Sequence, residues 1–176
     1  MPGTLYVSNA EAAGDRDLLA HLDIAAVISV GGGHRASSAP GVRFLHFGIK
    51  DRTSTDYTQI LREAVGFAGA ALKDGKSVLV HCLRGMHRSP TVAAGLLVAV
   101  GGLSGKEARS CVQAARPSVN FNAHLAAQID AFEVDVDVRA AGEHTVGGER
   151  RDGLCPHEPL SPCARPPRST QSTLAS

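Results

Sequence analysis

The sequence contains no tryptophan, and aromatic residues make up only 4% of it. Proteins that bind single-stranded nucleic acids stack the bases on aromatic side chains, so this scarcity argues against such a platform. The formal net charge is +1 at pH 7, and no strong field of either sign recruits nucleic acid or a membrane surface. We therefore expect neither a nucleic-acid partner nor a membrane partner.

Segments that would target the chain to a membrane or to the secretory pathway are also missing. The longest apolar run, residues 91–103, is too short to span a bilayer. The first residues have neither the basic start nor the apolar core of a signal peptide. Four cysteines are present, at Cys82, Cys111, Cys155 and Cys163. Their spacing shows no close pairing, so we interpret them as reduced thiols in a cytoplasmic protein, with the nucleus as an alternative.

The chain has 176 residues, 43% of them hydrophobic and 20% charged, which is enough for one domain with a core of its own. Its composition changes after Val138, where Gly, Pro, Ser and Arg dominate and apolar periodicity ends. Such a segment buries too little apolar surface to offset its ordering entropy. We therefore predict a single folded domain over residues 1–138 and a disordered tail over residues 139–176.

Apolar strands and amphipathic helices alternate along this domain, which predicts an α/β fold. The expected strands are residues 5–9, 25–30, 42–49 and 77–80. The expected helices are residues 13–22, residues 57–73, one that starts at Ser89, one capped by Ser104, and a last one that buries Leu125, Ile129 and Phe132. The apolar run at residues 77–80 is typical of a parallel strand that is covered on both faces.

The stretch "SVLVHCLRGMHRSP" joins this strand to the helix that starts at Ser89. A loop in that position points backbone N–H groups inward and leads into a helix N-terminus, which together favour a phosphate anion. A thiol at its floor, Cys82, is expected to have a pKa well below the ordinary ~8.5 and to act as a nucleophile. Arg88 can grip two phosphate oxygens, and Ser89 can donate a hydrogen bond to the sulfur. Gly85 lets the backbone approach the anion closely.

These residues match a known family. "HCLRGMHRS" resembles the H-C-x-x-G-x-x-R-S/T signature of cysteine-dependent protein phosphatases, and "ARPSVNFNAHLAAQIDAFE" resembles the small dual-specificity branch of that family. The resemblance implies a protein tyrosine phosphatase-like fold, with a central mixed, mostly parallel sheet flanked by helices. It also implies that the enzyme uses no metal and no cofactor.

The resemblance further assigns roles to single residues. Cys82 is the expected nucleophile, Arg88 the phosphate clamp, Ser89 the helper of the thiolate, and His81 a supporting residue that orients or tunes Cys82. The phosphate-binding loop comprises Leu83, Arg84, Gly85, Met86, His87 and Arg88.

The general acid of the family is an aspartate on a loop that precedes the cysteine. Asp51 follows a predicted strand at a suitable distance and is our candidate. Asp56 competes with it, but the run Thr53-Ser-Thr-Asp56 is also typical of a helix cap.

The function predicted from these features is hydrolysis of phosphotyrosine and of phosphoserine or phosphothreonine in protein substrates, by a monomer. A phosphoinositide or RNA 5′-phosphate phosphatase would use the same chemistry, and a non-catalytic phosphate-binding pseudophosphatase would keep only part of it. A sulfur transferase or an arsenate reductase also carries a loop cysteine, but neither accounts for His81, Gly85, Ser89 and Asp51 together.

Overall fold

A parallel β-sheet forms the centre of the structure. The computed structural model describes residues 3–31, 39–50, 55–143 and 161–164, and it describes only the backbone of residues 137–143 and 161–164. The strands are β1 (Thr4–Ser8), β2 (Ile24–Val30), β3 (Arg43–Phe47), β4 (Ser77–His81) and β5 (Ser161–Ala164). They lie in the order β3-β2-β4-β1-β5, and each described pairing is parallel. The α/β fold predicted from the sequence is confirmed, with a sheet that is parallel throughout these pairings.

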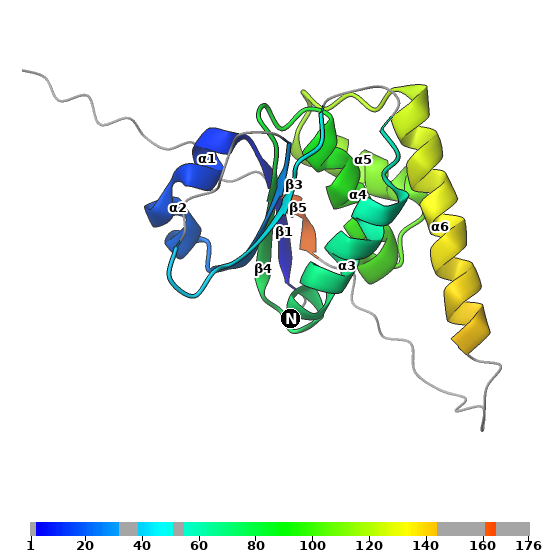
Figure 1. Ribbon diagram of the computed structural model, residues 1–176, viewed down its shortest axis with the longest axis horizontal. Coiled ribbons are helices and arrows are strands. Elements are labelled where there is room, and N and C mark those ends of the chain that lie inside the picture. The colour runs from blue at the N-terminus through cyan, green and yellow to red at the C-terminus, as the bar shows by residue number, and fades with distance from the viewer. Residues whose placement is uncertain (1–2, 32–38, 51–54, 144–160, 165–176) are drawn as a thin grey trace, which may run out of the picture.

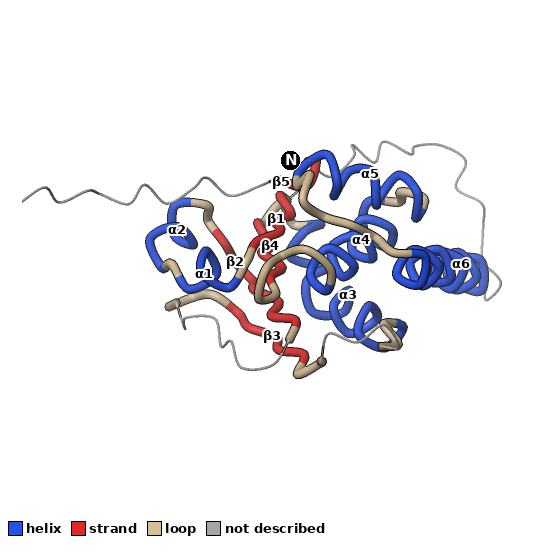
Figure 2. The backbone as a smooth tube through the Cα atoms, turned by 90° about the horizontal axis from the view of Figure 1, so that it is seen from above, coloured by secondary structure: helices blue, strands red, loops and turns tan. Residues whose placement is uncertain are grey.

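Helices cover both faces of the sheet (Figures 1 and 2). The helices are α1 (Ala10–Gly14), α2 (Arg16–His21), α3 (Thr58–Lys73), α4 (Arg88–Gly101), α5 (Gly105–Ala115) and α6 (Ala123–Glu143). The short helices α1 and α2 lie on one face, and the other four lie on the opposite face. Because β4 is covered on both faces, its residues are apolar in succession instead of alternating with polar ones.

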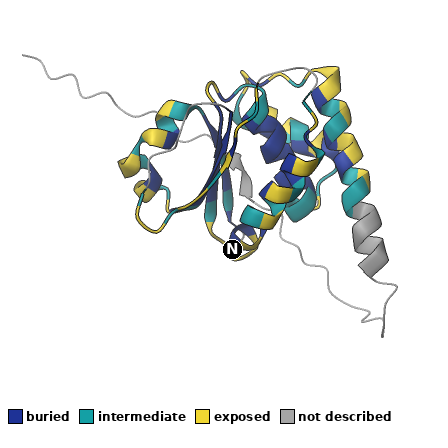
Figure 3. Ribbon diagram, in the orientation of Figure 1, coloured by how far each residue is buried: buried dark blue, intermediate teal, exposed yellow. Residues whose placement is uncertain are grey.

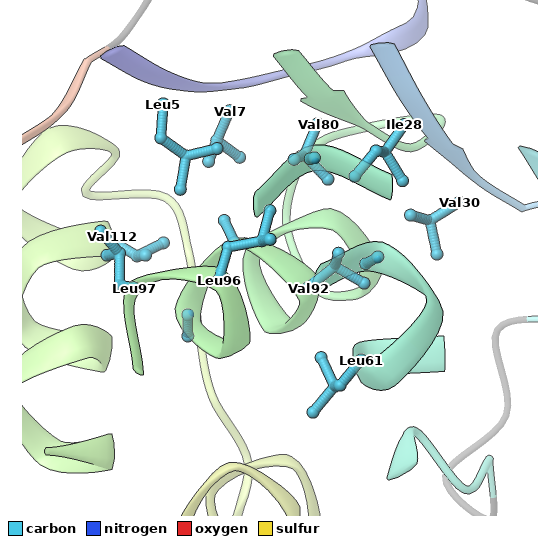
Figure 4. Close-up of a cluster of buried hydrophobic side chains, with 14 of the residues drawn as sticks. Leu5, Val7, Ile28, Val30, Leu61, Val80, Val92, Leu96, Leu97 and Val112 are labelled. Atoms are coloured by element: carbon cyan, nitrogen blue, oxygen red, sulfur yellow. The ribbon is translucent and has the colours of Figure 1, made fainter. Parts of the chain in front are cut away.

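The larger core lies between the sheet and α4. Residues 89–98 of α4 are all buried (Figure 3), because this helix packs against α3, α5 and α6 as well as against the sheet. Figure 4 shows Leu96 and Val92 of α4 facing Val80 and Ile28 of the sheet. A helix enclosed on all sides is apolar around its whole circumference, as the sequence of α4 is.

One predicted helix is divided in the structure. We expected a single helix over residues 13–22, but the chain forms α1 and α2 with a break at Asp15. The backbone of Asp15 is extended (φ −84°, ψ 104°), and its carboxylate accepts hydrogen bonds from the N–H groups of Asp17 and Leu18. An aspartate in that position satisfies the free donors at the start of a new helix, so it favours the break over a continuous helix.

Two other predictions about helices agree with the structure, one about a helix start and one about a buried helix face. The Ser104 hydroxyl accepts a hydrogen bond from the Glu107 N–H, and the Glu107 carboxylate accepts one from the Ser104 N–H, so the predicted capping box is confirmed. The helix predicted to bury three apolar side chains is α6, and Leu125, Ile129 and Phe132 are all buried.

The C-terminal region differs in part from the prediction. Helix α6 continues to Glu143, past the predicted boundary at residue 138. Ser161–Ala164 forms β5 beside β1, within the segment for which we predicted disorder. A sheet edge offers backbone hydrogen bonds to a chain of almost any composition, which is why composition did not reveal this strand. Residues 144–160 and 165–176 lie outside the described part, and for them the prediction of a disordered tail stays a prediction.

Because the strands are parallel, their carboxyl ends meet at one edge of the sheet. Ser8 of β1, Val30 of β2 and His81 of β4 reach this edge. Strand β4 lies between β1 and β2 although it follows both in the sequence. In open parallel sheets, ligands bind outside the carboxyl ends of the strands, at the point where the order of the strands reverses, as it does at β4. The fold thus points to the loop after β4 as the place to look for a site. In the part of the chain that the structure describes, we find no helix both long enough and apolar enough to span a bilayer.

The central position of α4 leads to a stability prediction. Leu96→Ala removes a fully buried side chain and should lower the free energy of unfolding by about 2–5 kcal/mol, because the cavity left behind loses packing contacts. Val134→Ala on α6, where the side chain is 62% exposed, is the matched control and should change it by less than about 0.5 kcal/mol. Urea denaturation of both variants tests this, and equal effects would show that α4 is not central to the core.

Candidate active site

The loop between β4 and α4 wraps around the side chain of Cys82. Strand β4 ends at His81 and α4 begins at Arg88, so the predicted strand, loop and helix are confirmed. Gly85 adopts a positive φ of 68°, which favours glycine. The loop turns so tightly that a Cβ atom at Gly85 would lie 2.5 Å from the carbonyl oxygen of Ser8. Any other residue at position 85 would therefore strain the loop and push it off β1.

The sulfur of Cys82 accepts two hydrogen bonds inside this loop. The Gly85 N–H donates one over an N···S distance of 3.1 Å, and the Ser89 hydroxyl donates the other over an O···S distance of 3.3 Å. Gly85 and Ser89 are buried, and so is Cys82, which is only 4% exposed. The predicted contacts of Ser89 and of the loop backbone with the sulfur are therefore present.

Two effects oppose each other at this thiol. Burial disfavours the charged form and raises the pKa of Cys82. The Ser89 hydroxyl and the nearby N–H groups of Ser89, Gly85 and Met86 favour the thiolate, and together they hold the pKa of this thiol below its usual value. The loop therefore stabilises a sulfur anion in a place where water cannot.

Arg88 extends from the first turn of α4 across the mouth of the loop. Its Nη1 donates to the carbonyl oxygen of Ile49 over 3.4 Å. The same nitrogen lies close above Gly31, where a Cβ atom would come within 2.3 Å of it. Gly31, which directly follows β2, thus makes room for the guanidinium.

A pocket opens between the loop and the end of β2. It is lined by Ser29, Val30, Gly31, His81, Cys82, Leu83 and Arg88. Leu83 is 49% exposed at its rim, and Arg84 is exposed beside it. Met86 and His87, the remaining predicted loop residues, are half-buried. Cys82 and Arg88 therefore border one shared pocket, as a phosphate site requires.

His81 is buried at the end of β4, on the face of the sheet that α1 and α2 cover. Its neighbours across the sheet are Ser8 of β1 and Ser29 of β2. Ser29 also exchanges a hydrogen bond with His46 of β3, over 3.2 Å between Oγ and Nδ1. Polar side chains thus line this end of the sheet below the pocket. The role of His81 in orienting or tuning Cys82 stays a prediction.

The two candidates for the general acid have different outcomes. Asp51 lies outside the described residues. Asp56 is described, and its carboxylate accepts a hydrogen bond from the N–H of Thr58 at the start of α3. This bond and the bond to the Thr58 side chain hold the pKa of Asp56 below its usual value. The N-cap residue of α3 is Tyr57, but the Asp56 carboxylate occupies a free N–H of the first turn, and it is ionised at neutral pH.

Two parts of the site were not found by reasoning from the sequence. The N–H of Ala10, at the start of α1, donates to the carbonyl oxygen of Leu83 over 3.3 Å. Arg116, which follows α5, donates from Nη2 to the carbonyl oxygen of Arg84 over 2.9 Å. Both contacts hold the outer side of the loop, and both join segments far apart in the sequence. In the described part of the chain, no three His, Cys, Asp or Glu side chains gather as they would to hold a metal ion.

Comparison with known proteins agrees with this geometry. Residues 5–135 match the family described as "Dual specificity phosphatase, catalytic domain". The chain belongs to the dual specificity phosphatase family. The resemblance noted in the sequence, including that to the small members of the family, is thereby confirmed.

Individual relatives place the chain among the small dual specificity phosphatases. It is 30% identical to mouse dual specificity phosphatase 28 over 158 residues, which cover 90% of this chain and 89% of that protein. It is 30% identical to human dual specificity protein phosphatase 22, over 76% of this chain and 71% of that protein. The crystal structure of human DUSP28 superposes with a TM-score of 0.72 at 27% identity, covering 77% of this chain and 94% of that one.

The hydrogen bonds at the sulfur predict how Cys82 reacts with an alkylating reagent. Only the thiolate is alkylated, so a lowered pKa moves the rise of the rate with pH toward lower pH. Ser89→Ala removes one donor, raises the pKa of Cys82, and should slow alkylation by iodoacetamide about tenfold at pH 6. The rates of the two proteins should converge at high pH.

Ser110→Ala is the matched control, because Ser110 is exposed on α5 and its hydroxyl donates only to the carbonyl oxygen of Lys106 among the contacts described. Mass spectrometry at Cys82 gives the rate for each protein. An unchanged pH profile in Ser89→Ala would show that the hydroxyl does not stabilise the anion.

Proposed function

We propose that this member of the dual specificity phosphatase family hydrolyses phosphotyrosine and phosphoserine or phosphothreonine in protein substrates, through a cysteinyl-phosphate intermediate. The observation that carries the proposal is the buried Cys82 sulfur, which accepts hydrogen bonds from Gly85 N–H and Ser89 hydroxyl and has a lowered pKa. The thiolate is the form of cysteine that acts as a nucleophile or a metal ligand, so a thiol held toward its anion indicates one of these two roles. Family membership favours the nucleophile.

In the first step, the thiolate attacks phosphorus opposite the leaving oxygen. The new S–P bond forms as the P–O bond to the substrate breaks, and the carboxylic acid of Asp51 gives its proton to the departing oxygen. The sulfur lone pair becomes the S–P bond, and the P–O bonding pair ends on the departing oxygen, which takes the proton and leaves as a neutral alcohol or phenol. The product on the protein is a phosphate ester of the Cys82 sulfur.

In the second step, a water molecule attacks the same phosphorus. The Asp51 carboxylate accepts a proton from the water, the S–P bond breaks, and Cys82 leaves as a thiolate. The Ser89 hydroxyl, 3.3 Å from the sulfur, is positioned to stabilise that leaving anion. Inorganic phosphate is released and the starting state is restored.

The loop contributes most when charge builds up on the phosphoryl oxygens. The N–H groups of Gly85, Met86 and Ser89 favour the anion at the sulfur, and Arg88 borders the pocket beside Cys82 in which those oxygens would lie. Donors that are already oriented need no reorganisation during the reaction, and this is usually the largest single contribution to catalysis. The guanidinium can hold two oxygens at once in its planar fork.

The proposal also covers the cellular compartment, the oligomeric state and the class of substrate. We propose that the protein works as a monomer in the cytoplasm or the nucleus, on phosphorylated proteins and not on nucleic acid or lipid. The net charge of +1 supports this, because it provides no general attraction to polyanionic surfaces.

Replacing the nucleophile tests whether the chain is an enzyme. Cys82→Ser should abolish hydrolysis of para-nitrophenyl phosphate in the presence of EDTA and leave phosphopeptide binding intact, because the hydroxyl is a far weaker nucleophile. Cys111→Ser, which changes a half-buried thiol on α5, is the control and should keep activity. Wild-type protein that binds phosphopeptide without turnover would instead identify a pseudophosphatase.

Replacing the two aspartates separately tests the general acid. Asp51→Asn should lower kcat by about 10²–10⁴ on substrates with poor leaving groups, such as phosphotyrosine peptides, and far less on para-nitrophenyl phosphate. Asp56→Asn should leave kcat nearly unchanged, because the Asp56 carboxylate is bound to the Thr58 N–H at the start of α3 and is already ionised. A larger loss in Asp56→Asn than in Asp51→Asn would transfer the role to Asp56.

A further inference from the structure

The peptide group between Arg84 and Gly85 makes a polar contact at each end. Its N–H, which belongs to Gly85, donates to the Cys82 sulfur over 3.1 Å. Its carbonyl oxygen, which belongs to Arg84, accepts a hydrogen bond from Arg116 Nη2 over 2.9 Å. One peptide group therefore links a cationic side chain beyond α5 to the proposed nucleophile.

The planarity of the peptide bond couples the two contacts. In a trans peptide the C=O and N–H bonds point in opposite directions and turn together. When Arg116 holds the carbonyl oxygen on the outer side of the loop, the N–H is directed inward, to the sulfur. A rotation that released the carbonyl would also turn the N–H away from Cys82.

The surroundings of Gly85 show how closely the loop is held at this point. A Cβ atom at position 85 would lie 2.5 Å from the Ser8 carbonyl oxygen and 3.0 Å from Arg116 Nη2. On the Ser8 side, the preceding peptide is held by the bond from Ala10 N–H to the Leu83 carbonyl. The end of β1 and the Arg116 guanidinium thus both lie against Gly85, in the space that a side chain would need.

The charge of Arg116 adds to the effect of its position. A guanidinium stays protonated throughout the pH range in which enzymes work. A cation that donates to a carbonyl polarises that peptide group, and a polarised peptide is a stronger N–H donor at its other end. Arg116 is half-buried, so water screens this effect only in part. The same contact therefore both aims the Gly85 N–H and strengthens it.

We propose that Arg116 is a positioning residue for the nucleophile: by holding and polarising the Arg84–Gly85 peptide, it keeps the Gly85 N–H on Cys82 and so maintains the thiolate. This inference rests on the proposed function, because it assigns Arg116 a part in preparing Cys82 for attack. Arg116 acts through the loop backbone, and its effect is the same for every phosphate ester.

The test is the pH dependence of Cys82 alkylation by iodoacetamide in wild-type protein, Arg116→Ala and Arg116→Lys. In Arg116→Ala, alkylation at pH 6 should be about three- to tenfold slower than in wild-type protein, and the two rates should meet at high pH. The acidic limb of the kcat/KM profile on para-nitrophenyl phosphate should move to higher pH by as many pH units as the alkylation profile does. Arg116→Lys keeps the charge but loses the planar fork, so it should fall between the two.

A chemical rescue separates positioning from a general loss of structure. Methylguanidine, added at a concentration far below that which unfolds the protein, should restore part of the alkylation rate of Arg116→Ala at pH 6 and should not change that of wild-type protein. Arg62→Ala is the matched control. It removes an arginine that pairs with Asp135 over 3.0 Å between α3 and α6, and it should leave both pH profiles unchanged.

The outcomes distinguish this inference from the proposed function. If wild-type Cys82 shows an ordinary thiol pKa, the proposed function fails and the role of Arg116 fails with it. If the wild-type pKa is low and Arg116→Ala leaves it unchanged, only the role of Arg116 is overturned. A loss of activity in Arg116→Ala that appears solely in KM for one substrate, with an unchanged alkylation profile, would also overturn it, because it would indicate a substrate contact.

Discussion

The site depends on the balance between two opposing effects on one sulfur atom. Burial of Cys82 favours the neutral thiol, whereas the Ser89 hydroxyl and the N–H groups of the loop favour the anion, and the donors prevail. If the loop opened, water would replace these donors and the thiol would return to its ordinary behaviour. The surrounding structure can be understood as the support that keeps several donors on one acceptor.

That support is provided by the whole fold. Strand β4 brings Cys82 to the carboxyl edge of the sheet, and α4 begins where the loop ends, so that the Ser89 hydroxyl donates to the sulfur from the first turn of a helix and Arg88 borders the same pocket. Because α4 is enclosed by the sheet and by α3, α5 and α6, its first turn has little freedom to move. Donors held in this way are oriented before a substrate arrives, which is the condition for strong electrostatic stabilisation.

Much of this arrangement could be predicted from the sequence, because its signals are local. The apolar run of β4, the spacing from Cys82 to Arg88, and the capping box at Ser104 each lie within one turn or one strand. The predictions were less accurate where two local signals compete and where distant segments meet. The local cap at Asp15 divided a predicted helix, and β5 formed on the edge of β1 although its own composition is typical of a disordered tail. Asp51 remains a candidate on its sequence position alone.

The sequence by itself determined the chemistry: a thiol, a guanidinium and a hydroxyl at fixed spacing between an apolar strand and a helix, in a pattern that only a few kinds of site require. Only the tertiary structure decided what surrounds that chemistry. Gly31 makes room for Arg88, Ser8 crowds Gly85, and Arg116 binds the outer side of the loop, although each comes from a different element. The physical reason is that hydrogen bonds and close packing act between neighbours in space. Those neighbours are set by the order of the strands and the enclosure of α4, which no short stretch of the chain encodes.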